Sequence, residues 1–151
     1  MKPWHAILFA SIAVLVGCGS RPTSDARFSP RPPEDLTIAV TVIAPEGSSP
    51  EPARFVIEPG GQLRAAVGAG STPETFPPKT RLLTDAQVSQ LYGIIAREGL
   101  ALPANAASRD TPRIEVTVIA GDTRRTGRHA LDDPEARLVV DRCQSLARLG
   151  D

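Results

Sequence analysis

Two near-identical stretches of alternating residues restrict the fold of this chain more than any other feature. Residues 38–44 read IAVTVIA and residues 114–120 read IEVTVIA, so they differ at one position of seven. Apolar side chains at every second position are typical of a β-strand that buries one face. The likeness favours chance similarity, because alternating valine, isoleucine and threonine make unrelated strands look alike, and two related halves are the alternative.

Further strands and turns are expected around these two stretches. Residues 53–58 continue the alternation, and the Pro-Gly-Gly turn at 59–61 allows residues 62–67 to return as a weaker strand. Gly121 and Asp122 form a two-residue hairpin signal that pairs Ala120 with Thr123. Residues 68–79 and 100–112 are expected to be loops.

Two helices complete the pattern. Thr84 and Gln87 form a capping box, which predicts a helix over 85–98 that ends before Gly99. Residues 132–135 predict the start of a final helix, because acidic side chains and proline suit a first turn. The apolar stripe of the first helix is Val88, Leu91, Tyr92 and Ile95, and that of the second is Val139, Cys143 and Leu146, with Leu138 beside them.

These patterns predict an α+β fold in the order β-β-β-α-β-β-α. We expect an antiparallel sheet of four to five strands with both helices packed on one face. Residues 35–151 would form this single domain, which leaves residues 1–34 for another role.

The first seventeen residues have the features of an export signal. A short, positively charged start precedes twelve apolar or small residues at 6–17. At 1.5 Å per residue such a helix covers about 18 Å, too little for a hydrocarbon core about 30 Å thick. Residues 1–17 are therefore predicted to be a signal peptide, and a buried apolar helix is the alternative.

The residues at the end of this run, Leu15-Val16-Gly17-Cys18, resemble the lipobox of bacterial lipoproteins. The resemblance implies cleavage between Gly17 and Cys18 and acyl chains on the Cys18 sulfur, with membrane lipid as the partner. An ordinary cleaved signal is the alternative. Gly19 and Ser20 follow the cysteine in place of the aspartate of the family's inner-membrane signal, which implies the periplasmic side of the outer membrane in a cell with two membranes.

Residues 18–34 carry the lipidated cysteine and a stretch rich in proline, serine and arginine. The prolines stiffen the stretch, and it has too few apolar side chains to form a core, so it is predicted to be a semi-rigid tether. Its arginines either are solvated or lie against anionic headgroups.

Composition excludes several classes of function. The chain has 17 basic and 17 acidic residues, a balance that argues against binding to nucleic acid. Its two cysteines cannot form a disulfide framework. No cofactor is expected.

The candidate reactive groups after the signal peptide are few. The hairpin register places His129 on the helix side of the sheet opposite Ile114, with Glu115 and Arg128 paired on the other side. A structural histidine is expected, and a base assisted by Asp132 or Asp133, or a metal ligand, is the alternative. Cys143 is expected to be a small buried residue rather than a reactive thiol. No catalytic or metal site is predicted.

Two features could contact a partner. The loop at 68–79 is long and stiffened by prolines, and it presents Phe76 as the best candidate contact residue, with simple packing as the alternative. Arg124, Arg125 and Arg128 could meet an acidic partner, although such arginines more often shield a sheet edge from pairing.

Residues 83–88 (LTDAQV) and 99–103 (GLALP), followed by a hairpin and a helix that begins at proline, resemble emfourin-like proteins. The likeness is an order of elements over residues 36–149, and it implies an α+β fold and inhibition of thermolysin-type metalloproteases. No motif is specific enough to carry an inhibitory residue over. Residues 45–50 also stand where the family has a glycine-aromatic segment in its first hairpin, and this departure argues against inhibition. The sequence thus predicts a membrane-anchored, non-enzymatic periplasmic binding module. A structural envelope component and a metalloprotease inhibitor are the alternatives.

Overall fold

The computed structural model describes residues 31–103 and 111–148. The strands are β1 (Thr37–Ile43), β2 (Ala53–Ile57), β3 (Gln62–Val67), β4 (Lys79–Leu82), β5 (Arg113–Ala120) and β6 (Thr123–Ala130). The helices are α1 (Asp85–Arg97) and α2 (Pro134–Arg148). The expected α+β class is confirmed.

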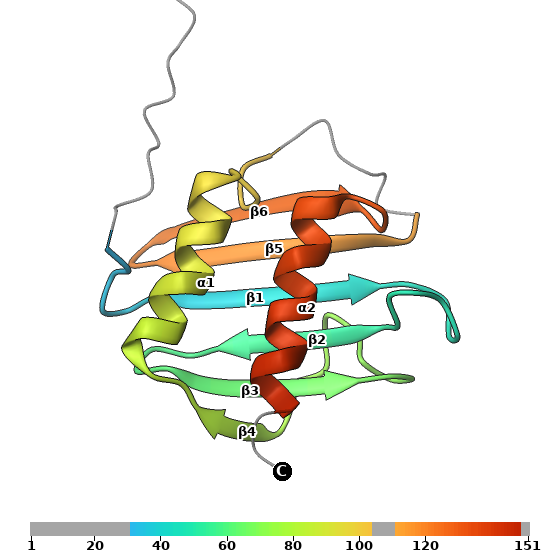
Figure 1. The fold of residues 1–151 in the computed structure, drawn as a ribbon, viewed down its shortest axis with the longest axis horizontal. Coiled ribbons are helices and arrows are strands. Elements are labelled where there is room, and N and C mark those ends of the chain that lie inside the picture. The colour runs from blue at the N-terminus through green and yellow to red at the C-terminus, as the bar shows by residue number, and fades with distance from the viewer. Residues whose placement is uncertain (1–30, 104–110, 149–151) are drawn as a thin grey trace, which may run out of the picture.

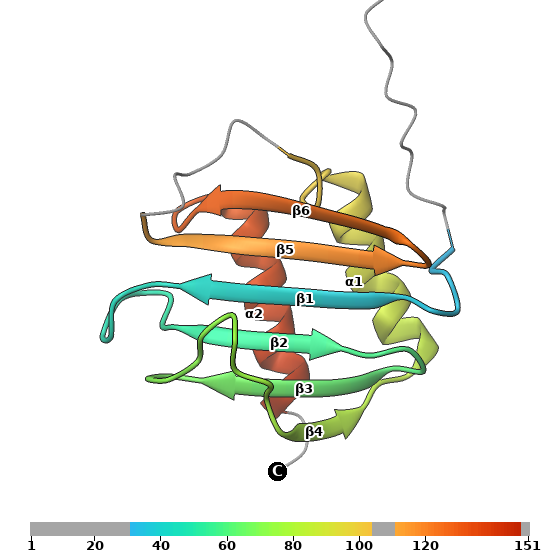
Figure 2. The ribbon, with the colours of Figure 1, turned by 180° about the vertical axis from the view of Figure 1, so that it is seen from behind.

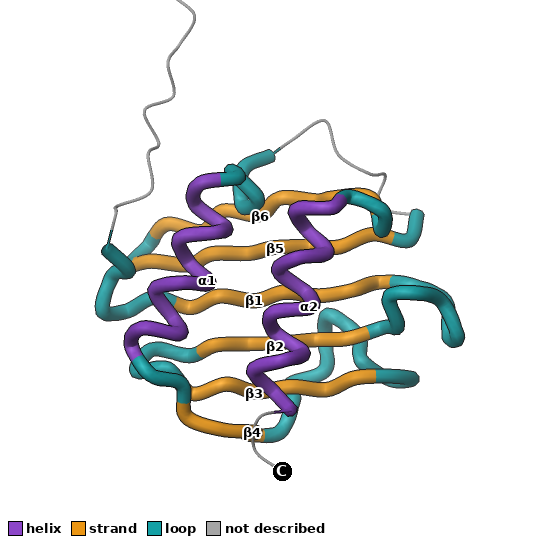
Figure 3. Tube along the Cα trace, viewed as in Figure 1, coloured by secondary structure: helices purple, strands orange, loops and turns teal. Residues whose placement is uncertain are grey.

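The strands form one antiparallel sheet in the order β4-β3-β2-β1-β5-β6 (Figure 1). The hairpin register expected from the turn at Gly121 is confirmed, because Ala120 pairs with Thr123 and Ile114 pairs with His129. Both helices cross one face of the sheet, as expected (Figure 3).

The strand β4 corrects the expectation of four to five strands. It is a four-residue edge strand that pairs only with β3, and none of its residues is buried. An edge strand has a neighbour on one side only, so it does not require the apolar alternation that marks a central strand. For this reason the pattern gave no sign of it.

The core lies between the sheet and the helices. Its largest fully buried side chains include Phe55, Ile38, Ile57, Leu63, Leu91 and Ile95. The capping box of α1 is confirmed, since the Thr84 hydroxyl accepts from the Gln87 amide and the Gln87 side chain accepts from the Thr84 amide.

The expected stripe of α2 is confirmed at Val139, Cys143 and Leu146 but wrong at Leu138, which is 51% exposed. Consecutive helical residues point about 100° apart, so only one of the two neighbours of Val139 can also face the sheet. That neighbour is Val140, which is buried, and Leu138 therefore faces solvent.

The two repeated stretches form the two central strands, β1 and β5, which pair with each other. Val40 lies opposite Val116 at the centre of the pair. On either side of them, Ile38 pairs with Val118 and Val42 pairs with Ile114. These residues all face the helices. The two stretches differ only at their second position, which is Ala39 in β1 and Glu115 in β5. Both of these residues lie on the opposite face of the sheet.

That opposite face carries no helix, and we call it the open face (Figure 2). The register of the strands places on it, among others, Ala39, Thr41, Arg54, Glu115, Thr117 and Arg128. The loop between β3 and β4 folds over part of it, across β2 and β3.

Candidate functional site

The expected lipid-attachment residue, Cys18, and the expected cleavage site between Gly17 and Cys18 lie outside the described residues. So does the tether at 18–34, except for residues 31–34. Within the ranges 31–103 and 111–148, no helix has the length and hydropathy needed to cross a membrane.

The candidate contact residue Phe76 is displayed on the loop between β3 and β4. Its side chain is 65% exposed, so the ring is not part of the hydrophobic core. The guanidinium carbon of Arg64, on β3, lies 4.3 Å from the centre of the ring, within the range of a cation–π interaction. The aromatic ring is thus held in place while most of its surface faces solvent.

Arg64 also fixes the loop that carries the ring. Its Nη1 donates to the Pro77 carbonyl oxygen at 3.2 Å, and its Nε lies 3.0 Å from a carboxylate oxygen of Glu58. Farther along the loop, the Thr75 hydroxyl donates to the Gly70 carbonyl oxygen at 2.8 Å. The contact of Arg64 with Phe76 has no signal in the sequence, because the loop that returns Phe76 to β3 shows no periodic pattern.

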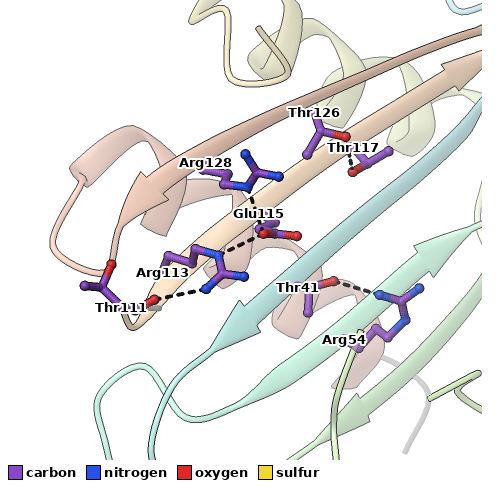
Figure 4. A network of polar contacts seen from close by, with 8 residues as sticks. All are labelled: Thr41, Arg54, Thr111, Arg113, Glu115, Thr117, Thr126 and Arg128. Atoms are coloured by element: carbon purple, nitrogen blue, oxygen red, sulfur yellow. Dashed lines mark hydrogen bonds and ion pairs between the residues drawn. The ribbon is translucent and has the colours of Figure 1, made fainter. Parts of the chain in front are cut away.

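A polar cluster lies on the open face at β5 and β6 (Figure 4). One oxygen of Glu115 accepts from Arg113 Nε at 2.8 Å and from Arg128 Nε at 3.1 Å. The expected pair of Glu115 with Arg128 is therefore confirmed. Arg113 was not expected there, although its place two residues before Glu115 on one strand was the available signal.

Threonine hydroxyls continue this polar surface across the central strands. The hydroxyls of Thr117 and Thr126 lie 2.9 Å apart, and Arg54 Nη1 donates to the Thr41 hydroxyl at 2.9 Å (Figure 4). Thr41 and Thr117 are both buried although no helix covers them. Arg54 lies against Thr41, and Thr126 lies against Thr117.

Burial and neighbouring charges shift the pKa values of Glu115 and Arg54 on the open face. Burial opposes ionisation of Glu115, but hydrogen bonds and charge attraction from Arg113 and Arg128 outweigh it and lower the pKa of this carboxyl. Burial lowers the pKa of Arg54, attraction to Glu74 and Glu115 partly offsets this effect, and repulsion from Arg124 adds to it.

The three arginines of β6 do not form one cluster. Arg124 and Arg128 share the open face with Glu115, whereas Arg125 pairs with Val118 and faces the helix side. There it influences Tyr92, whose pKa is raised by burial and lowered to a lesser extent by Arg125. β6 is an edge of the sheet, so these side chains also occupy a position that discourages pairing with another chain.

His129 has the expected structural role. It is 9% exposed, its Nε2 lies 2.8 Å from the Leu100 carbonyl oxygen, and its Nδ1 lies 3.1 Å from Asp133 Oδ2. A carbonyl oxygen only accepts, so Nε2 carries the hydrogen. The imidazole therefore connects β6, the loop after α1 and the start of α2.

Asp133 uses its two oxygens for two tasks. Oδ2 meets His129, and Oδ1 accepts from the Ala136 amide at 3.0 Å, which caps α2 as expected. Burial opposes ionisation, but the hydrogen bonds from Ala136 and His129 outweigh it and lower the pKa of Asp133. Gly127 allows this corner to close, because a Cβ atom there would collide with the Leu100 carbonyl oxygen.

The remaining candidate groups do not meet one another. Cys143 lies on the buried side of α2, as expected, and burial raises the pKa of its thiol to about 12. No set of three histidine, cysteine, aspartate or glutamate side chains within the described part of the chain is placed to hold a metal ion.

A scan against protein-family models and a search of curated proteins found no match to this chain. Its function therefore has to be argued from its own residues.

Proposed function

We propose that this protein is a lipoprotein anchored in the membrane through an acylated Cys18, and that its domain binds another protein and has no enzymatic activity. The anchor is supported by the motif at 15–18 and by the apolar run before it, which is too short to span a bilayer. Two or three acyl chains would hold the protein firmly, since each buried methylene contributes about 0.8 kcal/mol. The proposed location is the extracytoplasmic side of a membrane, which in a cell with two membranes is the periplasmic side of the outer membrane.

The observation that carries the binding role is the exposed ring of Phe76. An apolar aromatic side chain gains nothing from facing water, yet here Arg64 supports the ring and the loop on which it lies. An aromatic residue that is already ordered loses little conformational entropy on binding, and such residues often dominate interface energies. Phe76 is therefore the proposed centre of the contact.

The groups best suited to catalysis have internal roles, which favours binding over catalysis. Both ring nitrogens of His129 face acceptors within the fold. The Cys143 thiol is buried, and its raised pKa keeps it protonated at neutral pH.

The binding role is tested with the full-length protein, tagged at its C-terminus and recovered from membranes in mild detergent. We expect Phe76→Ala to lose a protein that copurifies with the wild type. Leu138→Ala is the matched control, because it removes an exposed apolar side chain from the helix side. Equal recovery of that protein with Phe76→Ala and with wild type would contradict the proposal.

The anchor is tested separately. Cys18→Ala should abolish both labelling by a fatty-acid analogue and partitioning into the detergent phase. Mass spectrometry of the native protein should show an acylated cysteine at the new N-terminus. A chain that retains Met1, or an unmodified Cys18, would refute the anchor.

A further inference from the structure

We infer that the open face of the sheet is the docking surface for an acidic segment of a partner protein, with Phe76 at its rim. This inference rests on the proposed binding function and adds the chemistry of the partner.

The open face carries more arginines than carboxylates paired with them. Four of its arginines are Arg54, Arg64, Arg124 and Arg128. Arg64 pairs with Glu58 and Arg128 pairs with Glu115. Arg54 and Arg124 form no ion pair with any carboxylate in the described part of the chain. At longer range Glu74 and Glu115 attract Arg54, and Arg124 repels it. Both guanidinium groups can therefore form an ion pair with a carboxylate of a partner.

The side chain of Arg54 is ordered and partly buried. Its Nη1 is held by the Thr41 hydroxyl, and its Nε is buried without a hydrogen-bond partner. The side chain is thus ordered and partly dehydrated before any partner arrives, which reduces the entropy and desolvation costs of binding. A guanidinium group also matches a carboxylate in geometry and forms strong charge-assisted hydrogen bonds with it.

Small side chains occupy part of the sheet surface between Arg54 and Arg124. Ala39 and Thr117 pair across β1 and β5 in the row between Arg54 and Arg124. Small residues leave room for a polypeptide to approach the sheet. An extended segment directs alternate side chains to the same side, so it could direct several carboxylates toward this face at once.

The described end of the tether lies on the other side of the sheet from the open face. Residues 31–34 line a surface hollow together with Gly60, Asp85 and Ser89, so the described chain begins beside the first turn of α1. The open face is thus not covered by residues 31–34.

The test uses the full-length protein reconstituted into phosphatidylcholine vesicles. The probe is a short fluorescent peptide in which glutamate alternates with threonine, and its counterpart with lysine in place of glutamate is the control peptide. Fluorescence anisotropy should show binding of the acidic peptide only, and binding should weaken as salt is added.

A pair of double variants locates the binding surface. We expect Arg54→Gln with Arg124→Gln to weaken binding of the acidic peptide by roughly tenfold or more. Arg97→Gln with Arg142→Gln removes the same charge from the helices and should change binding by less than about twofold. Circular dichroism checks that both double variants are folded.

Three results would overturn the inference. These are no binding of the acidic peptide by the wild type, equal weakening by both double variants, and loss of peptide binding when phosphatidylglycerol is added to the vesicles. The last result would assign the face to the membrane. None of them affects the copurification test with Phe76→Ala, so the proposed binding role can survive the failure of this inference.

Discussion

The two faces of the sheet belong to the same strands, but their side chains are held by different interactions. On β2, Phe55 points into the core and is fully buried, whereas its neighbour Arg54 lies on the open face and bonds to Thr41. Full burial of a large apolar side chain contributes about 1.5–3 kcal/mol, while a solvent-accessible ion pair contributes about 0–1 kcal/mol. The helix side thus supplies most of the stability, and the open face can carry charge for recognition at little cost to the fold.

The largest effect is expected from Phe55→Ala. This change removes a fully buried ring and leaves a cavity, so the free energy of unfolding should fall by about 3–5 kcal/mol in urea denaturation. Val56→Ala, next along β2 but on the open face, is the control and should cost clearly less. Equal losses would break the distinction between the two faces.

A smaller effect is expected from Asp133→Asn on the helix side. The asparagine oxygen can still accept from the Ala136 amide, but loss of the negative charge at the helix N-terminus and beside His129 should lower the free energy of unfolding by about 1–2 kcal/mol at pH 7. Because the folded protein holds the pKa of Asp133 below its ordinary value of 3.8, the wild type keeps this contribution above that pH and loses it as pH falls through the folded value.

The difference in stability between wild type and Asp133→Asn should therefore shrink in strongly acidic solution, as measured by urea midpoints from pH 7 downward. A difference that stays constant with pH would mean that the charge on Asp133 is not responsible.

On the open face, Glu115→Gln should lower the free energy of unfolding by about 1 kcal/mol. The amide keeps the shape of the carboxylate but loses its attraction for Arg113 and Arg128, and solvent limits the loss. High salt should reduce the difference, since it screens the wild-type pairs. A loss as large as that of Phe55→Ala would show that the open face also determines stability.

The smallest effect on stability is expected from Phe76→Ala. An exposed ring contributes little to folding, so the change should be below about 0.5 kcal/mol in urea denaturation. Loss of partner binding without loss of stability would sharpen the contrast between the two faces. A large loss of stability would instead show that the ring with Arg64 serves to hold the loop.

Most of the fold could be predicted because its central parts are marked by local chemistry. The alternation in β1 and β5 requires one apolar face, and the hairpin turn at Gly121 sets the register that places His129 opposite Ile114. The hydroxyl of Thr84 and the side chain of Gln87 mark where α1 begins. In each case a few neighbouring residues contain the whole signal.

The parts that could not be predicted depend on residues far apart in the sequence. β4 is a strand only because β3 lies beside it, and Arg64 meets Phe76 only because a loop returns over the sheet. The exposure of Leu138 follows from which side of α2 fits the sheet, and a leucine at that position is compatible with either side. The placement of Arg54 and Arg124 on the same face also requires the register of all the strands from β2 to β6.

The contact between His129 and Asp133 has a consequence for how the molecule opens. The imidazole bonds to the main chain just after α1, and the carboxylate bonds to the first turn of α2. Neither helix end can therefore separate from the last strand without breaking a contact shared with the other. Local unfolding at this corner should release both helix ends together, and amide hydrogen exchange at Ala136 and at the end of α1 should rise in parallel when this contact is removed.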